Sequence, residues 1–341
     1  MHRLAGAPIS WGVCEVPNWG HQLDPDSVLG EMAELGLSAT EHGPPGFLPE
    51  DAGARAALLA RHGLSGIAAF VAVVLHEGPA PSASSSAGQE ADISVGADAS
   101  EGSDDPTDNN GTADSNTTDS GTYDNNTDSD PVHQLQPTLD ALAADGAEVL
   151  VVAASTGADG YDTAAQLDAQ QWQILLRNLD RISAAAAERG LRATIHPHVG
   201  TVIETPEQIA RVLAGSQIEL CLDTGHTFLG GSDPRALAVE HAGRIGHVHL
   251  KDLHLSLGEQ VRVGGLGYTD AVRAGLYAPV GTGDLDIAGI VTTLEDAGYQ
   301  GWYVLEQDAV LTSAPEPGSG PINDVRTSLE HLRRLAPGTP A

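Results

Sequence analysis

Short apolar runs alternate with longer amphipathic segments along most of the chain. The runs have the length and composition of buried strands, and the segments between them repeat apolar residues with the period of a helix. Eight strands are predicted, over residues 4–9, 38–41, 65–74, 148–152, 192–196, 219–223, 245–250 and 302–306. Helices are predicted over residues 26–35, 51–62, 135–144, 167–189, 206–213, 234–242, 287–297 and 322–335.

Eight units of strand followed by helix predict an α/β fold, a (β/α)8 TIM barrel that forms a single domain over residues 1–341. Glycine follows several predicted helices, as expected just past a helix end, at Gly36, Gly63, Gly146, Gly190 and Gly298. A doubly wound sheet is the alternative, but no strand is followed by a Gly-rich dinucleotide fingerprint. In such barrels the reacting groups lie at the C-terminal ends of the strands.

One tract interrupts the pattern after the third predicted strand. Residues 79–132 consist mainly of Ser, Thr, Asp, Asn, Gly and Ala, with 12 acidic residues and no Lys or Arg. Such a composition cannot bury enough apolar surface to offset the entropy lost on ordering. We therefore expect a long disordered acidic insert at the rim of the barrel, needed for solubility in salt and dispensable for chemistry.

The whole chain is strongly acidic, with 47 acidic residues against 16 basic ones and a formal net charge of minus 31. This charge argues against nucleic acid and anionic membranes as partners. No apolar stretch is long enough to span a bilayer, and the first residues lack the apolar region of a secretory signal, so we expect a cytoplasmic protein. An acidic surface poor in lysine is typical of a halophilic protein, although a high-GC genome also favours arginine over lysine.

Side chains that commonly bind metals end the last four predicted strands, and they are His196, Asp223, His249 and Glu306. Two imidazoles and two carboxylates, brought together by barrel closure, suit Mn²⁺, Co²⁺, Fe²⁺ or Zn²⁺. Strand alternation places His247 on the same face as His249 but farther from the C-terminal end, so we expect a packed barrel residue there. Lys251 is the only lysine in the chain, and its ammonium can donate a hydrogen bond to a ketone or enolate oxygen.

Several motifs resemble the inosose (2-keto-myo-inositol) dehydratases, within the xylose isomerase-like sugar isomerase and epimerase barrels. They are Ala7-Pro8-Ile9-Ser10-Trp11-Gly12-Val13, Ala39-Thr40-Glu41-His42-Gly43, His196-Pro197-His198-Val199-Gly200-Thr201, Leu222-Asp223-Thr224-Gly225-His226 and His249-Leu250-Lys251-Asp252. The resemblance covers essentially the whole chain outside the acidic insert. It implies a divalent metal held by the four strand-end residues, Mn²⁺ or Co²⁺ before Zn²⁺, Fe²⁺ or Mg²⁺. His198 is the alternative to His196 as a ligand.

The activity implied is that of a lyase in inositol catabolism, which removes water from 2-keto-myo-inositol through a metal-bound enediolate and gives a trihydroxycyclohexane dione. The candidates for acid and base, in no order, are Lys251, His198, His226 and Glu41. Trp11 is expected to form an apolar wall against the substrate ring, and Asp252 to bind substrate hydroxyls. The expected partner is a small keto-polyol or sugar, and a homo-oligomer is left open.

Other activities are compatible with the same barrel. The main alternative is a ketose 3-epimerase or sugar isomerase that uses the same metal. Epimerases of the superfamily carry glutamate where this chain has His196, a difference that favours elimination. An endonuclease barrel with several zinc ions lacks evident further ligands here, and a metal-free barrel that only binds a polyol is the remaining alternative.

Overall fold

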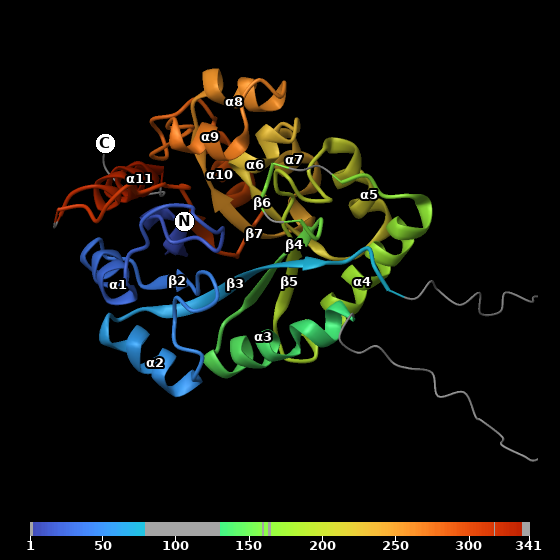
Figure 1. Ribbon diagram of the computed structural model, residues 1–341, viewed down its shortest axis with the longest axis horizontal. Helices are drawn as coiled ribbons and strands as arrows, with labels where there is room; N and C mark the ends of the chain where they lie inside the picture. The colour runs from blue at the N-terminus through green and yellow to red at the C-terminus, as the bar shows by residue number, and fades with distance from the viewer. Residues whose placement is uncertain (1–2, 79–129, 159, 163–164, 317, 336–341) are drawn as a thin grey trace, which may run out of the picture.

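The computed structural model describes residues 3–78, 130–158, 160–162, 165–316 and 318–335, and its centre is a closed barrel of parallel strands with helices around it (Figure 1). The strands are hydrogen-bonded in the order β1-β10-β7-β6-β5-β4-β3-β2, and β2 pairs with β1 to close the barrel. The barrel strands are β1 (Leu4–Gly6), β2 (Ala39–Glu41), β3 (Ser65–Val74), β4 (Val149–Ser155), β5 (Arg192–Ile195), β6 (Glu219–Asp223), β7 (Ile245–Leu250) and β10 (Tyr303–Leu305).

Helices follow the strands along the chain. The α-helices are α1 (Pro25–Glu34), α2 (Ala52–Arg61), α3 (Pro131–Asp145), α4 (Ala169–Ala187), α5 (Pro206–Gly215), α6 (Thr224–Leu229), α7 (Pro234–His241), α8 (Leu255–Arg262), α9 (Tyr268–Arg273), α10 (Ile287–Asp296) and α11 (Pro321–Leu335). Two 3-10 helices, η1 (Pro8–Trp11) and η3 (Ala242–Arg244), precede α1 and β7. A small antiparallel pair, β8 (Asp252–Leu253) and β9 (Tyr277–Ala278), lies outside the barrel.

The predicted TIM barrel is confirmed, and three of its strands, β3, β6 and β7, have the predicted bounds. β1 is shorter than predicted because η1 begins at Pro8, whose ring cannot continue a strand ladder. The five glycines predicted to follow helices all have positive φ, between 66° and 81°. A residue with a Cβ is strained in that conformation, so these positions end the helices as expected.

Helix starts are also encoded locally. Thr205 and Gln208 form a reciprocal capping box at α5, and Asp168 forms another with Gln171 at α4. Each pair satisfies backbone N–H groups that have no partner inside the helix. Pro206 occupies the first position of α5, where a missing N–H has no cost.

The acidic insert predicted over residues 79–132 lies almost wholly outside the described residues. Its last three residues are described, and they begin α3: Asp130 caps the helix, and Pro131 and Val132 form its first turn. The predicted disorder and the predicted role in salt therefore stay predictions. Within the described ranges, no helix is long and apolar enough to cross a membrane.

The chain between β7 and α10 contains elements that the sequence pattern did not predict. β8, α8, α9 and β9 form an excursion over residues 252–278, and α8 lies against both α6 and α9 (Figure 1). Its apolar side chains, among them Leu253, Tyr268, Leu276 and Tyr277, pack with Trp19 into a cluster separate from the main core. The excursion thus brings two tyrosines toward the C-terminal end of the barrel.

Candidate metal centre and active site

Four predicted ligands converge at the C-terminal end of the barrel, one from the end of each of β5, β6, β7 and β10. His249 Nδ1 lies 2.6 Å from Glu306 Oε2 and 3.7 Å from Asp223 Oδ2. His196 Nε2 lies 3.5 Å from the same Asp223 oxygen. One donor atom from each side chain fits within 4.8 Å of all the others. Barrel closure therefore brings together residues that are far apart in sequence.

The donor atoms fit a divalent cation. Asp223 Oδ2, His249 Nδ1 and Glu306 Oε2 are buried and make no well-aligned hydrogen bond, although they lie close to one another. Buried polar atoms without hydrogen bonds are rare, and each needs an explanation such as an ion. Mixed imidazole and carboxylate donors are the ligands that Mn²⁺, Co²⁺, Fe²⁺ and Zn²⁺ accept.

Hydrogen bonds to the backbone orient two further imidazole atoms. His196 Nδ1 lies 2.8 Å from the carbonyl oxygen of Pro197, and His198 Nδ1 lies 2.7 Å from that of Val199. Because a carbonyl only accepts, each Nδ1 carries the proton, and each Nε2 keeps its lone pair. The structure brings His196 to Asp223, whereas the His198 ring lies against Tyr161, with ring centroids 4.2 Å apart.

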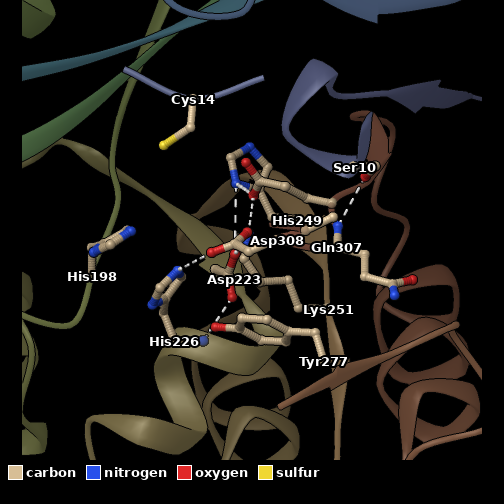
Figure 2. Close-up of polar contacts among 12 residues, drawn as sticks. Ser10, Cys14, His198, Asp223, His226, His249, Lys251, Tyr277, Gln307 and Asp308 are labelled. Atoms are coloured by element: carbon tan, nitrogen blue, oxygen red, sulfur yellow. Dashed lines mark hydrogen bonds and ion pairs between the residues drawn. The ribbon is translucent and has the colours of Figure 1, made fainter. Parts of the chain in front are cut away.

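Lys251 lies beside the carboxylates of this group and is only 2% exposed. Its Nζ lies 2.7 Å from Asp308 Oδ1, 2.8 Å from Glu306 Oε2 and 3.5 Å from Asp223 Oδ2. Burial alone would lower the pKa of Lys251, but these carboxylates outweigh it and hold the pKa well above its usual value. The side chain is therefore an ammonium, placed between Asp308 and the four predicted ligands (Figure 2). These ligands, His196, Asp223, His249 and Glu306, are called the metal-binding group below.

Asp308 and Tyr268 are part of the site and were not among the predicted site residues. The Tyr268 hydroxyl donates to Asp308 Oδ2 and lies 3.4 Å from His226 Nε2. Burial raises the pKa of Asp308, and the ammonium of Lys251 opposes this effect. Strand alternation could have identified Asp308, because it follows Glu306 by two residues. Tyr268 comes from α9, and no sequence signal pointed to it.

Two neutral imidazoles stack beside this pair. The rings of His198 and His226 are stacked, with centroids 3.7 Å apart and an angle of 28° between their planes (Figure 2). Burial lowers the pKa of His198 to about 3 and holds that of His226 well below its usual value. Both rings are therefore uncharged near neutral pH and can accept a proton or a hydrogen bond.

A cavity of about 280 Å³ opens onto these polar side chains at the C-terminal end of the barrel. Its polar end is formed by Glu41, His196, His198, Lys251, Glu306 and Asp308. Its other walls are mainly apolar and include Pro8, Ile9, Val13, Trp19, Pro44 and Phe70. A mostly apolar cavity with a few convergent polar groups is the usual form of a small-molecule site.

Five of the predicted site residues are not among the described residues that line the cavity. Two of them, Asp223 and His249, belong to the group of four predicted ligands. His226 lies behind His198, as the stacking shows. Trp11 is fully buried, and its Nε1 donates to Glu31 of α1 at 2.7 Å. The Asp252 carboxylate accepts the backbone N–H groups of Leu253, Gly281, Gly283 and Leu285. Trp11 and Asp252 thus hold the surrounding framework.

Glu41 lines the cavity, and its carboxylate also contacts two imidazoles of β7, those of His247 and His249. Burial opposes ionisation of Glu41, but the two imidazoles outweigh it and hold the pKa of this carboxyl at about 2. His247 is completely buried, in agreement with the packed barrel residue predicted at this position.

Curated proteins with similar sequences include a rhizopine catabolism protein and several inosose dehydratases. The rhizopine catabolism protein MocC of Rhizobium meliloti is 34% identical over 50% of this chain and 52% of its own length. The inosose dehydratase of Geobacillus kaustophilus is 27% identical over 90% of this chain and 87% of its own length. In the first of these matches, the chain spans only about half the length of the relative.

Solved structures with the same fold include an L-ribulose 3-epimerase, at a TM-score of 0.62 with 14% identity and complete coverage of both chains. The IOLI protein with a bound zinc atom is similar at a TM-score of 0.59 and 12% identity, over 98% of this chain and 97% of that one. At these identities the likeness shows the fold. The family model described as xylose isomerase-like TIM barrel matches residues 118–335. With the closed barrel and the strand-end donors in place, we conclude that the chain belongs to the xylose isomerase-like TIM barrel family.

Proposed function

We propose that this chain is a metal-dependent hydro-lyase that removes water from 2-keto-myo-inositol and forms a trihydroxycyclohexane dione. The observation that carries the proposal is the convergence of buried donor atoms from His196, Asp223, His249 and Glu306. Two of these residues, His196 and Glu306, line the cavity. The similarity to an inosose dehydratase along most of both chains supports the choice of substrate.

We assign the four donor side chains as ligands of a divalent cation, with Mn²⁺ or Co²⁺ as first candidates. When bound, such a cation polarises a ketone and acidifies the neighbouring C–H group. The similar IOLI structure with a zinc atom supports a divalent cation in this fold without identifying it here.

We assign the removal of the substrate proton to His198. Its Nε2 is free to accept because Nδ1 donates to Val199, and the side chain lines the cavity. His226 stacks behind it and limits its movement. Its low pKa makes His198 a weak base in the free protein. It therefore needs a C–H group that has been made more acidic, as a bound divalent cation would do.

We assign the proton for the leaving hydroxyl to Lys251, whose Nζ is a charged donor at the cavity wall. The proton taken at His198 and the proton released from Lys251 balance the water that leaves. Asp308 keeps the ammonium oriented from one side, at 2.7 Å. Direct substrate binding by Trp11 and Asp252 stays a prediction, and their hydrogen bonds favour a supporting role.

A ketose 3-epimerase or sugar isomerase is the alternative proposal, because the same ligands and the same proton acceptor serve proton transfer without loss of water. The similar L-ribulose 3-epimerase has this fold. Elimination needs an acid for the leaving hydroxyl, and a buried ammonium at the cavity wall meets that need.

The test is to incubate the purified chain with Mn²⁺ or Co²⁺ and 2-keto-myo-inositol, and to follow the dione by its absorbance. Parallel reactions with free ketoses test the alternative. We expect dione formation that is lost on chelation and restored by the metal. Conversion of ketoses without any dione would overturn the dehydratase proposal in favour of the epimerase or isomerase.

The two proton roles can be separated by running the reaction in D₂O. Lys251→Gln should keep exchange of the substrate proton and lose elimination, whereas His198→Asn should lose both. His76→Asn is a matched control, because His76 is also buried but does not line the cavity among the described residues. If Lys251→Gln eliminates water at the wild-type rate, the assignment of the acid is wrong.

A further inference from the structure

The Glu41 carboxylate crosses the barrel interior to reach β7. β2, which ends at Glu41, is separated from β7 by β1 and β10 in the barrel order. Nevertheless Glu41 Oε1 lies 2.8 Å from His247 Nε2 and 3.1 Å from His249 Nε2. Glu41 is 3% exposed, and both histidines are completely buried. A single carboxylate oxygen thus contacts two imidazoles of β7, one of which, that of His249, belongs to the metal-binding group.

This contact determines which nitrogen of His249 carries the proton. An ionised carboxylate has no donor, so the imidazole must donate its Nε2–H to Glu41. The lone pair of a neutral His249 is then on Nδ1. That atom faces Glu306 Oε2 at 2.6 Å and Asp223 Oδ2 at 3.7 Å, among the other donor atoms.

His247 holds the carboxylate from below. His247 and His249 are two residues apart on β7, so both rings face the barrel interior, with centroids 5.2 Å apart. His247 Nε2 donates to the same Glu41 oxygen at the shorter distance, 2.8 Å. With donors on both sides of this oxygen, the carboxylate cannot move away from His249 without losing a buried hydrogen bond.

Charge points in the same direction. Among the described residues that contact Asp223 and Glu306, the one permanently charged cation is the ammonium of Lys251. The Glu41 carboxylate adds a third negative charge on the other side of the His249 ring from these two carboxylates. Buried charges need partners, and a divalent cation at the donor atoms would balance the excess.

We propose that Glu41 is a positioning residue that holds His249 as the Nε2–H tautomer, and so presents His249 Nδ1 to a divalent cation, while His247 keeps Glu41 in place. This inference rests on the metal site of the proposed function. It assigns to Glu41 an indirect role in place of proton transfer to the substrate. Residues that orient a metal-binding histidine in this way commonly change metal affinity 10- to 100-fold when replaced.

The experiment uses Glu41→Gln and Glu41→Ala in the full chain, with Glu31→Gln as the matched control. Glu31 is also a carboxylate that accepts one side-chain N–H, from Trp11, but it belongs to α1 and does not line the cavity among the described residues. Gln keeps the shape and loses the charge, and its amide can turn so that it donates to His249 Nε2. Ala removes both the charge and the hydrogen bonds.

Two measurements report on the role without relying on turnover. The Kd of the metal-free protein for Mn²⁺, measured by calorimetry, should rise about 10- to 100-fold in Glu41→Gln, at least as much in Glu41→Ala, and not in Glu31→Gln. The ¹⁵N chemical shifts of histidine side chains, measured in the metal-free protein at a pH where His249 is neutral, should show His249 as the Nε2–H tautomer in the wild type and as a mixture in both Glu41 variants. His247→Gln, which retains a donor, should change the Kd less than Glu41→Ala.

A Kd within twofold of the wild type in Glu41→Gln and Glu41→Ala, with the His249 tautomer unchanged, would overturn the inference and leave the proposed metal site standing. A wild-type protein that binds no divalent cation would overturn the metal site itself, and this inference with it. A purely structural role for Glu41 predicts lower thermal stability with an unchanged tautomer, and that result would also contradict the proposal.

Discussion

The two ends of the barrel interior are equally buried and chemically opposite. Toward the N-terminal end, the interior is filled by small and apolar side chains, among them Ala5, Ala39, Ile67, Ala68, Val149, Val151, Cys221 and Val304. Toward the C-terminal end, the interior holds Glu41, His196, Asp223, His249 and Lys251, each at most 3% exposed. The N-terminal end is a packed core, called the lower layer below, and the C-terminal end is a charged site, called the upper layer.

A step of two residues along one strand separates these layers. On β6 the step leads from Cys221 to Asp223, and on β2 it leads from Ala39 to Glu41. Residues two apart on a strand face the same side, so both members of each pair point into the barrel. The difference teaches that the fold separates packing from chemistry by height along the strands, and substitutions in the two layers should have separable effects.

The largest expected effect is in the upper layer, for Asp223→Asn. Asn can still accept the N–H of His226 that Asp223 Oδ1 accepts at 2.7 Å, so the start of α6 should persist. The charged donor at Oδ2 is lost, and with it several kcal/mol of transition-state stabilisation, so kcat/KM should fall about 1,000-fold. Steady-state kinetics and metal content after dialysis measure this. Val151→Ala, in the lower layer, should retain activity within about threefold, and a comparable loss there would break the comparison.

The next effect is in the lower layer, for Ile67→Ala. Ile67 is 2% exposed within the apolar cluster, and its truncation should lower the free energy of unfolding by about 2 to 4 kcal/mol through lost burial and a cavity. Urea denaturation measures the change. The Kd for Mn²⁺ should stay within twofold of the wild type. A large change in metal affinity would show that the two layers are coupled.

A smaller effect concerns acid, and it again distinguishes the layers. The folded pKa of His198 is about 3 because of burial, below the value of about 6.5 in an unfolded chain. Above pH 6.5 the His198 side chain is neutral in both the folded and the unfolded chain, so its contribution to stability is fully present. Below it the unfolded chain binds the extra proton, so stability should fall by up to about 1.4 kcal/mol per pH unit from this group.

Urea denaturation of the metal-free protein at pH 7.5, 6.5 and 5.5 checks this pH dependence. In His198→Asn, the change of the free energy of unfolding with pH below 6.5 should be smaller, by the equivalent of close to one bound proton. In Ile67→Ala it should be the same as in the wild type. Equal slopes in the wild type and His198→Asn would show that His198 is not buried in its neutral form.

The smallest expected effect on chemistry comes from deleting residues 82–130, which belong to neither layer. We expect kcat/KM within twofold of the full chain in dilute buffer, because the described part of the chain contains all the proposed ligands and proton donors. The acidic composition of the segment predicts lower solubility of the deletion variant in concentrated salt, measured by light scattering. Complete loss of turnover in the deletion variant under saline conditions would contradict this division of roles.

Much of the fold could be predicted because its signals are local. The alternation of apolar runs with amphipathic segments identified the barrel strands, and glycines with positive φ marked the ends of helices. The excursion with α8 and α9 was missed because its helices are short, eight and six residues, and its strands have two residues each. Such elements form through tertiary packing and leave little periodicity in a sequence.

The sequence by itself determined the strand ends, and therefore which side chains could meet at one end of the barrel. Only the tertiary structure decided where each one lies there: His196 joins Asp223 while His198 lies against Tyr161, and Trp11 turns toward α1. Side-chain period is a local property of a strand, so a sequence reveals it. Which atom faces which depends on contacts between residues as distant as Glu41 and His249, and those exist only once the barrel closes.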